Sequence, residues 1–397
     1  MKTEAAVWQD YRLDAASWRR GRNRLAALAL AGWAVCALGY AAEPKRMAAA
    51  YLIAFLYFLT LALGALFFVM VQHLTGAVWS VTCRRMAENS MATLLAAPVL
   101  FLPVALNIPL LYEWSHAGLA DPILRGKQLY LNPAAFLARA AVYLLIWAFW
   151  SRRLAGLSLA LDRGAGPETL RSAARWSAAG LILAILTVTF AAFDWIMSLT
   201  PHWYSTVFGI YLYAGGAVGF LAALIAVLLM FRRAGRLQDA VRADHYHDLG
   251  KWLFALIVFW AYIAFSQYML IWYANLPEET VWYRMRIQGG WGPIAVLLGA
   301  GHFLIPFFAL ISRAAKRNLA WLGAAAVWML AMHYLDLYWL VAPAFHSSGP
   351  VWGWPEAAAL GATAGSVGLV FWAHLGRGAL VPAGDPRLAA SLEFHNV

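Results

Sequence analysis

The sequence predicts an all-helical integral membrane protein, and three observations support this fold class. Of its 397 residues, 63% are hydrophobic and only 12% are charged, whereas charged residues make up about a quarter of a typical soluble domain. The chain contains ten apolar runs, and each approaches the roughly 20 residues that are needed to cross a bilayer. Lys and Arg are concentrated in alternate loops between these runs, which is how multi-pass membrane proteins are oriented.

The apolar runs divide the chain into a membrane domain at residues 25–376, a basic segment at 1–24 and a tail at 377–397. The predicted spans lie at residues 25–42, 47–72, 91–111, 134–150, 176–199, 203–231, 252–275, 291–312, 319–341 and 356–376. The first run is short, but the segment before it is too long and too acidic for the basic region of a signal peptide. We therefore expect a helix there.

The 1–24 segment places Trp8, Tyr11, Ala15 and Trp18 at helical spacing, with arginines between them. Two interpretations remain open. The segment either lies flat on the cytoplasmic face of the membrane as an amphipathic helix, or it is a disordered basic tail.

The distribution of positive charge predicts that both termini are cytoplasmic. Of the 30 Lys and Arg residues, 23 lie on the side of the N-terminus, six lie in the opposite loops and one, Arg139, lies inside a span. Positive charge collects on the cytoplasmic side of membrane proteins. The net charge of +11 therefore serves the membrane, and no nucleic-acid partner is expected.

The cysteines and the loops limit the chemistry that the chain can carry. Cys36 and Cys83 are too few for a disulfide framework, and no C-x-x-C-H motif or Cys/His run is present, so no covalently bound haem, iron–sulfur cluster or metal site is predicted. No loop exceeds about 25 residues, which is too short for a nucleotide-binding domain. The chain is therefore not expected to be catalytic alone, and no catalytic residue is predicted.

A short internal similarity predicts two parallel four-helix bundles. Asp194 precedes Pro201 by seven residues, and Asp336 precedes Pro343 by the same number. Spans two to five and six to nine would then form the two bundles, with spans one and ten peripheral, as in membrane proteins built from parallel repeats.

Prolines and glycines add two local expectations. Pro98, Pro103 and Pro109 should bend span three, and Pro306 should bend span eight. Two G-x-x-x-G pairs, at 215/219 and 361/365, are more simply explained by close helix packing than by a functional role.

Ionisable side chains inside the spans are the candidate functional residues, because each costs on the order of 3 kcal/mol to insert. The candidates are His73, Arg139, Asp194, His302, His333 and Asp336.

The pair His333 and Asp336 is the strongest candidate, since residues at i and i+3 share a helical face, and His302 is expected at a similar depth. Arg139 could instead extend to the outer interface, either aspartate could simply pair with Arg139, and His302 and His73 could be packed core histidines.

Four strings of the sequence resemble the NrfD/polysulfide-reductase-type integral membrane subunits of respiratory complexes. The strings are WSVTCRRMAEN (79–89), FDWIMSLTPHWYSTVFG (193–209), SQYMLIWYANLPEETVWY (266–283) and MHYLDLYWLVAP (332–343). They are most similar to the second such subunit of bacterial alternative complex III, a quinol:cytochrome c or quinol:electron-acceptor oxidoreductase. The resemblance covers nearly the whole chain.

This resemblance implies a ten-helix subunit in the bacterial inner membrane, within a large electron-transport complex. The implied partners are an iron–sulfur subunit, a multihaem cytochrome c subunit, another NrfD-like membrane subunit and small membrane subunits. Haem and iron–sulfur clusters would belong to those partners, and quinone or quinol is the implied ligand in the membrane.

We hypothesise that His333, Asp336 and Asp194 form an outward-facing proton relay, continued inward by His302 and His73, with Arg139 as a fixed counter-charge. Three alternatives stay open. The chain could be a purely structural subunit, a proton-coupled secondary transporter, or a b-type cytochrome with His302 and His333 as axial ligands.

Overall fold

The computed structural model describes residues 11–116 and 121–396, and every regular element in these ranges is a helix. Ten helices or series of helices are long and apolar enough to span a membrane. This confirms the predicted fold class. The spans are α2 (Ala15–Ala42), α3 (Pro44–Leu74), α4 to α6 (Val81–Leu106), α9 (Pro133–Asp162), α10 with η3 (Glu168–Leu199), α11 (Phe208–Arg233), α12 (Ala243–Ala274), α14 to α15 (Gly289–Leu310), α17 with η5 (Leu319–Ala344) and α18 (Trp354–Leu375).

Two of these spans are built from several short helices. The third consists of α4 (Val81–Met91), η1 (Ala92–Ala96), α5 (Ala97–Leu100) and α6 (Leu102–Leu106), with α7 (Ile108–Leu111) following it. The eighth consists of α14 (Trp291–Leu298), the π-helical segment η4 (Gly299–Leu304) and α15 (Ile305–Leu310). Both interruptions lie at the predicted prolines, which remove backbone donors and disturb helical hydrogen bonding.

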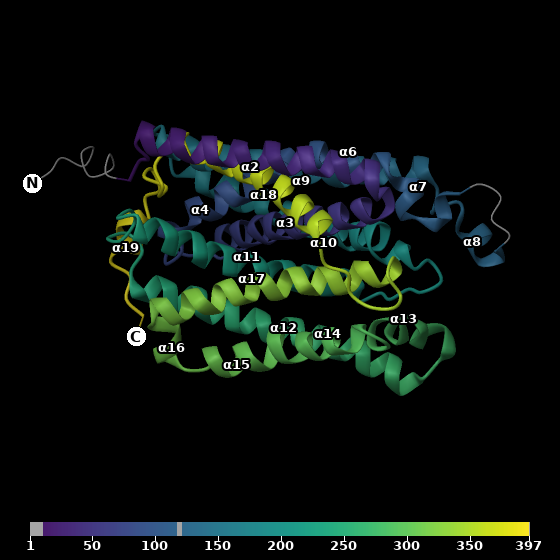
Figure 1. The fold of residues 1–397 in the computed structure, drawn as a ribbon. Coiled ribbons are helices and arrows are strands. Elements are labelled where there is room, and N and C mark those ends of the chain that lie inside the picture. Colours follow the sequence, from purple (N-terminus) through teal and green to yellow (C-terminus); the bar gives the residue numbers. More distant parts are fainter. Residues whose placement is uncertain (1–10, 117–120, 397) are drawn as a thin grey trace, which may run out of the picture.

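The spans form two four-helix bundles and a peripheral pair, as the repeat predicts. The first bundle contains α3, the α4–α6 span, α9 and α10, and the second contains α11, α12, the α14–α15 span and α17. The bundles meet where α3 packs against α11, while α2 and α18 pack on each other beside α3 (Figure 1).

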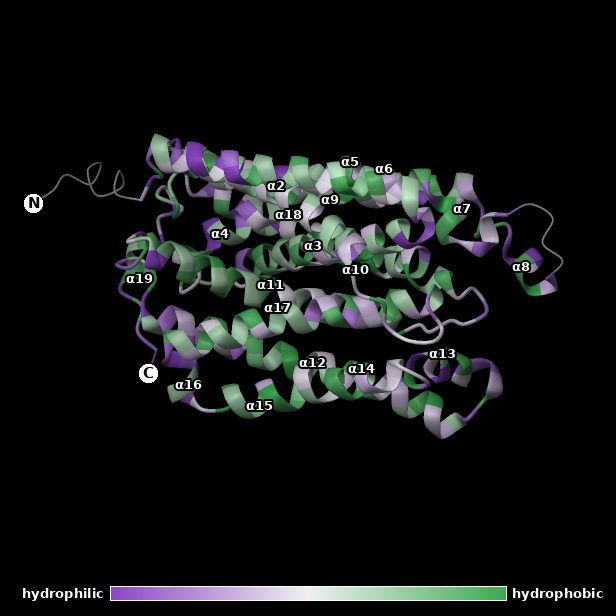
Figure 2. Cartoon of the chain, viewed as in Figure 1, coloured by the Kyte–Doolittle hydropathy of each residue, from purple (hydrophilic) through white to green (hydrophobic). Residues whose placement is uncertain are grey.

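The start of α2 lies at one end of the molecule, together with α16 (Arg313–Arg317) and α19 (Leu388–Leu392), and we call this the termini end (Figure 1). The opposite end carries the short helices α8 (Pro122–Lys127) and α13 (Pro277–Ile287). Apolar residues dominate between the two ends, and hydrophilic residues gather at them (Figure 2). By the distribution of positive charge, the termini end is the expected cytoplasmic side.

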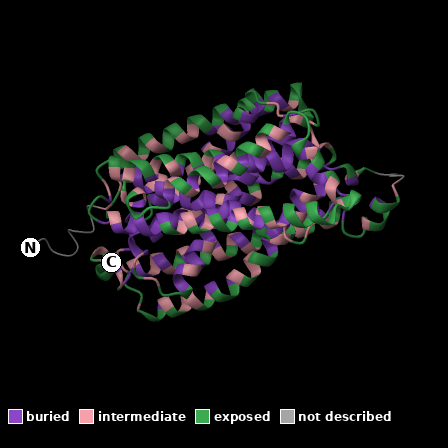
Figure 3. Ribbon diagram, turned by 90° about the horizontal axis from the view of Figure 1, so that it is seen from below, coloured by how far each residue is buried: buried purple, intermediate pink, exposed green. Residues whose placement is uncertain are grey.

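Burial follows the bundle arrangement. The helix α3 is buried along almost its whole length between the two bundles, whereas exposed residues lie on the outer faces of the helices (Figure 3). Many exposed side chains are large and apolar, such as Leu30 and Leu106, which are 73% and 80% exposed. In a bilayer these surfaces face lipid.

The peripheral pair is held by close backbone contact. A Cβ atom on Gly365 would lie 2.4 Å from the backbone nitrogen of Ala29, and one on Gly32 would lie 2.3 Å from that of Ala362. Only glycine allows this approach, so the close-packing interpretation of the second G-x-x-x-G pair is confirmed at Gly365.

The first span begins earlier than predicted. The helix α2 starts at Ala15, where the carboxylate of Asp14 accepts a hydrogen bond from the backbone N–H of Ser17 (2.8 Å). Residues 15–24 therefore continue the first span and do not form a separate surface helix. Trp18 contacts the end of α18, since its indole N–H donates to the carbonyl of Trp372 (3.2 Å). The predicted amphipathic pattern also includes residues 1–10, which lie outside the described ranges.

The third span also begins earlier, at Val81 and not at residue 91, because its charged residues are buried in ion pairs. Arg84 pairs with Glu88 (Nε to Oε1, 3.1 Å) and with Asp385 of the tail, and Arg85 pairs with Asp162 (Nη2 to Oδ2, 2.8 Å). Both arginines belong to the positive charges counted as loop residues on the basis of sequence. Asp385 of the tail neutralises Arg84 and Asp162 of α9 neutralises Arg85, so the helix extends past its apolar run.

Candidate functional site

Three of the predicted residues come together in the second bundle. His302 of η4 and His333 and Asp336 of α17 each offer a nitrogen or oxygen atom within 4.8 Å of the others. His302 and His333 are fully buried, and Asp336 is 2% exposed. We call these residues the His–His–Asp cluster. The expectation that His302 and His333 lie at the same depth is confirmed.

Asp336 is held by neutral donors. Its Oδ1 accepts a hydrogen bond from the Tyr211 hydroxyl (2.5 Å), and its Oδ2 accepts one from the Trp260 indole N–H (3.1 Å). The donors come from α11 and α12. Within the described ranges, no Lys or Arg side chain forms an ion pair with this carboxylate, so a buried acidic group lacks the compensating charge that such groups normally have.

The hydrogen bonds of His333 fix its tautomer. The Thr60 hydroxyl donates its one hydrogen to the carbonyl of Tyr57 (3.0 Å) and lies 2.8 Å from Nε2 of His333. With that hydrogen directed at Tyr57, Nε2–H of the imidazole donates to Thr60. The other nitrogen, Nδ1, then carries a lone pair, and it has no hydrogen-bond partner among the described residues.

His302 lies in the π-helical segment η4, a local irregularity that is frequent at functional sites. Its ring stacks on the indole of Trp260, with centroids 3.8 Å apart. Neither ring nitrogen of His302 has a hydrogen-bond partner in the part of the chain that the structure describes. Stacking therefore positions this ring, while its nitrogens remain free. Buried polar atoms without partners are unusual in native proteins.

The first G-x-x-x-G pair gives the cluster its space. A Cβ atom on Gly215 would lie 3.3 Å from Oδ2 of Asp336 and 3.4 Å from Nδ1 of His333, and one on Gly219 would lie 2.6 Å from Cδ2 of His333. These two acceptor atoms therefore lie against the same bare patch of the α11 backbone. The close-packing interpretation of this glycine pair therefore holds, and the side chains that pack against it belong to the His–His–Asp cluster.

Asp194 and Arg139 form a separate site in the first bundle. Two nitrogens of Arg139 donate to the two carboxylate oxygens of Asp194 (2.9 and 2.8 Å), and the Tyr143 hydroxyl donates to Oδ2 (2.9 Å). Arg139 also donates to the carbonyl of Tyr130 (2.9 Å) and stacks over its ring. The structure thus realises the simple pairing of one aspartate with Arg139.

The structure does not connect all the residues of the hypothesised relay. Across residues 11–116 and 121–396, no hydrogen bond joins Asp194 or His73 to the His–His–Asp cluster. His73 is buried near the end of α3 that lies at the termini end, and its Nε2 has no partner among these residues. The complete relay therefore stays a prediction, and its geometric centre is the cluster of His302, His333 and Asp336.

A cavity of about 400 Å³ adjoins the cluster. It lies between α12, α13 and the α14–η4 segment, and its walls are mainly aromatic and small apolar side chains. Both donors to Asp336, Tyr211 and Trp260, are part of its wall. Phe265 and Val296, also in the wall, are 61% and 73% exposed, so the cavity opens toward the lipid.

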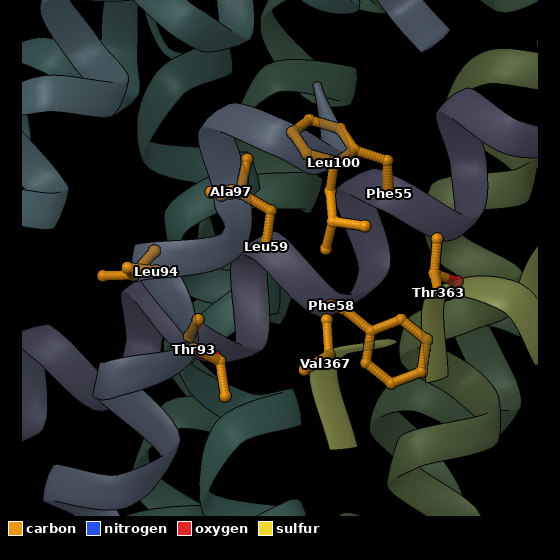
Figure 4. A pocket seen from close by; sticks show the side chains of 10 residues that line it. Phe55, Phe58, Leu59, Thr93, Leu94, Ala97, Leu100, Thr363 and Val367 are labelled. Atoms are coloured by element: carbon orange, nitrogen blue, oxygen red, sulfur yellow. The ribbon is translucent and has the colours of Figure 1, made fainter. Parts of the chain in front are cut away.

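The cavity between α3, the η1–α5 segment and α18 is very different. The side chains around it, including Phe55, Leu59 and Thr363, leave only about 10 Å³ (Figure 4). This is about the space that one water molecule needs. It is a packing void, and it carries no ligand site.

Two residues of α13 complete the site, although the sequence analysis did not select them. The Tyr283 hydroxyl lines the large cavity and accepts a hydrogen bond from Gln267 (3.1 Å), and burial raises the pKa of this phenol. Its own hydrogen has no acceptor among the described residues, which leaves it available to a ligand. Gln267 is a polar residue inside the predicted span 252–275, and this is the sequence signal that could have pointed here.

Arg286 was counted as a loop charge, but it is 1% exposed. It donates to the backbone carbonyls of Trp282 (3.1 Å) and Leu340 (2.7 Å) and stacks over the Trp282 ring at 3.7 Å. Burial lowers its pKa to about 9. The carbonyl of Leu340 belongs to the last turn of α17, where a cation is favourable. Arg286 thus fixes α13 on the bundle beside the cavity.

The tail contributes the acidic partner of the buried arginines at the termini end. Burial alone would raise the pKa of Asp385, but hydrogen bonds and charge from Arg387 and Arg84 outweigh this and hold the pKa well below its usual range. Asp385 is therefore ionised at neutral pH, and the tail is held to α4 by charge.

Comparison with known proteins adds no family to this description, since no protein-family model matches the chain and no curated protein matches it significantly. Fold and site define a multi-pass, all-helical membrane protein with ten spans and a buried His–His–Asp cluster in its second bundle.

Proposed function

We propose that the chain is the membrane subunit of a quinol:electron-acceptor oxidoreductase complex, and that quinol binds in the aromatic cavity beside the His–His–Asp cluster. The observation that carries the proposal is the shared wall: Tyr211 and Trp260 line the cavity and donate to the uncompensated carboxylate of Asp336. The four strings that resemble NrfD-type subunits support the same class of complex.

The cavity suits a quinol headgroup in shape and chemistry. Ligand pockets of this kind are mostly apolar, with a few polar groups that orient the ligand. The aromatic walls can stack on a quinol ring, the free hydrogen of Tyr283 can bond to one ring oxygen, and the opening toward lipid admits an isoprenoid tail. All these features belong to the one cavity that adjoins the cluster.

The cluster supplies a route for protons. Oxidation of quinol to quinone releases two electrons and two protons, and the hydrocarbon interior offers a carrier for neither. An iron–sulfur or haem group in a partner subunit would accept the electrons. The protons pass through Tyr211 to Asp336 and then to the free nitrogens of His333 and His302, since imidazole accepts and releases protons readily near neutral pH.

Co-purification tests membership of such a complex. When the chain is isolated in mild detergent, iron–sulfur and multihaem cytochrome subunits should accompany it. If the chain is isolated alone and is also stable alone, the complex is excluded.

Substitution of the carboxylate tests the site. Asp336→Asn should lower quinol turnover of the assembled complex by about 100-fold or more, the scale of a lost acid–base group. Asparagine keeps the shape and can still accept from Tyr211, so assembly should be unchanged. Unchanged turnover in the assembled variant would remove Asp336 from the mechanism.

Filling the cavity tests the binding mode. A Cβ atom on Gly299 meets no atom within 4 Å, and Gly299 lies in the cavity wall, so Gly299→Leu should raise KM for quinol without disturbing the fold. Gly156 is the control: it is an exposed helical glycine of α9 with equal space around its Cβ. Gly156→Leu should leave KM unchanged, and an equal effect of both variants would contradict quinol binding here.

A further inference from the structure

We propose that the His–His–Asp cluster is a binding site for a divalent transition-metal ion of the zinc class. The sequence analysis predicts no metal site because the chain has no ligand motif at regular spacing. The structure assembles the ligands from two helices instead, η4 and α17. Two imidazoles and one carboxylate form a donor set that zinc and its neighbours in the first transition row prefer.

Each imidazole of the cluster offers one lone pair that has no hydrogen-bond donor among the described residues, and His302 also carries one N–H without an acceptor. Nδ1 of His333 carries a lone pair, since its Nε2–H is committed to Thr60, and neither nitrogen of His302 has a partner. Beside them lies the carboxylate of Asp336, which has accepted only one hydrogen bond on each oxygen. Facing lone pairs repel one another unless a cation or a hydrogen lies between them, and a metal ion satisfies all three ligands at once.

The geometry allows one ion to reach the three ligands. Around a tetrahedral zinc ion with ligand distances of about 2.0–2.2 Å, the ligand atoms lie about 3.3–3.6 Å apart. The three atoms of the cluster lie within 4.8 Å of one another, so small side-chain rotations close the site. Three protein ligands leave a fourth position for water, as in zinc sites that are not purely structural.

The surroundings of His333 have the form expected of a metal ligand. A ligating histidine normally donates its second ring N–H to an oxygen that fixes its orientation, and Thr60 receives this hydrogen bond, anchored in turn on the carbonyl of Tyr57. Gly215 provides the bare backbone against which Nδ1 and Oδ2 meet. Neither Thr60 nor Gly215 touches quinol in the proposed function, so zinc binding in variants of either residue tests the metal site.

The inference stands independently of the proposed function and has one consequence for it. A metal ion and a proton compete for the same lone pairs. If the cluster also accepts protons from quinol, bound zinc should inhibit turnover. Zinc that binds without inhibition would support the metal site and contradict the proton route.

The test is the zinc content of the purified intact complex after incubation with Zn²⁺ and gel filtration, measured by mass spectrometry of the metal. We expect one retained zinc per chain above the content of a His302→Gln/His333→Gln variant. His73→Gln is the control, because it removes another buried histidine from a membrane helix while leaving the cluster intact. It should retain the wild-type content. Equal zinc in the wild-type protein and the double variant would overturn the proposal.

A second variant keeps the test valid if the double variant does not assemble. Thr60→Val leaves every ligand in place and removes only the oxygen that orients His333, so it should weaken zinc binding by about 10- to 100-fold. Co²⁺ in place of Zn²⁺ should give the visible absorption of a four-coordinate site in the wild-type complex. Wild-type affinity in Thr60→Val, or absence of the cobalt spectrum, would also contradict the site.

Discussion

The two bundles carry an aspartate at the same place in their last helix, but the partners of its carboxylate differ. Asp194 and Asp336 each lie seven residues before a proline. Asp194 forms a two-pronged ion pair with Arg139, whereas Asp336 has only the neutral donors Tyr211 and Trp260. The same backbone position thus holds a neutralised charge in one bundle and an uncompensated one in the other.

The neighbouring positions differ in the same direction. Arg139 lies six residues after Pro133, and the residue six after Pro293 is Gly299, which opens onto the large cavity. Three residues before the aspartate, the first bundle has Ala191 and the second has His333. The polar residues at these positions of the first bundle therefore form a stable ion pair. The second bundle has no such ion pair, and it has imidazoles and an open cavity instead.

The largest effect should come from making the first bundle resemble the second. Arg139→Gln leaves the fully buried carboxylate of Asp194 without its counter-charge. Removal of one partner from a buried ion pair costs about 3–5 kcal/mol. The free energy of unfolding, measured by denaturant titration in detergent, should fall by this amount.

A second substitution separates charge from packing in that experiment. Arg139→Gln/Asp194→Asn removes both charges and should recover most of the lost stability, since no buried charge is then left alone. Asp336→Asn should cost only about 1 kcal/mol, the scale of one hydrogen bond. If Asp336→Asn were as destabilising as Arg139→Gln, Asp336 would have a counter-charge and the contrast between the bundles would be wrong.

The sequence was sufficient to predict the spans and the bundles, because apolar runs and basic loops reflect the bilayer directly. It was less reliable at helix starts, where charges are present. Arg84 looks like a loop residue until the tail is seen to bring Asp385 onto it. Such pairing joins residues about 300 positions apart, and no local pattern encodes it.

The same limit applies to the site. His333 and Asp336 could be recognised as a pair because helical spacing places them on one face. Their closeness to His302 could be expected only as equal depth, and the role of Thr60 could not be predicted, because it depends on how α3 packs against α17. Arg286 lies between two spans, as predicted, but its burial could not be predicted, because it depends on how α13 folds back against the bundle.

A smaller effect on stability should come from removing the tyrosine hydroxyl that donates to each aspartate. Tyr143 donates to Asp194 and Tyr211 donates to Asp336, so Tyr143→Phe and Tyr211→Phe each remove one hydrogen bond to a carboxylate. Such bonds contribute about 1.5–3 kcal/mol, and both variants should lose stability in this range.

Quinol turnover of the assembled complex should distinguish the two tyrosines. Only Tyr211 lies in the cavity wall, so Tyr211→Phe should lower turnover and Tyr143→Phe should not. Equal turnover in the two variants would mean that the second bundle has no special role, and the comparison would reduce to two structural sites.

The smallest effect concerns Thr187 of α10 and Thr60 of α3, which have the same hydrogen-bonding arrangement, although only Thr60 bonds to a residue of the second bundle. Thr187 donates to the carbonyl of Leu183 and accepts from the indole N–H of Trp147 (2.8 Å), just as Thr60 donates to Tyr57 and accepts from His333. Valine at either position removes two neutral hydrogen bonds, each of which contributes about 0.5–1.5 kcal/mol. The difference lies in the partner. Trp147 has one N–H and remains packed, whereas an unanchored His333 can change tautomer and turn its protonated nitrogen toward Asp336.

Thr187→Val should therefore change only the melting temperature, while Thr60→Val should also lower turnover. A Thr60→Ser variant, which restores the hydroxyl, should recover the turnover. Failure of serine to recover turnover would show that the Thr60 methyl group, and not the hydrogen bond, positions the imidazole.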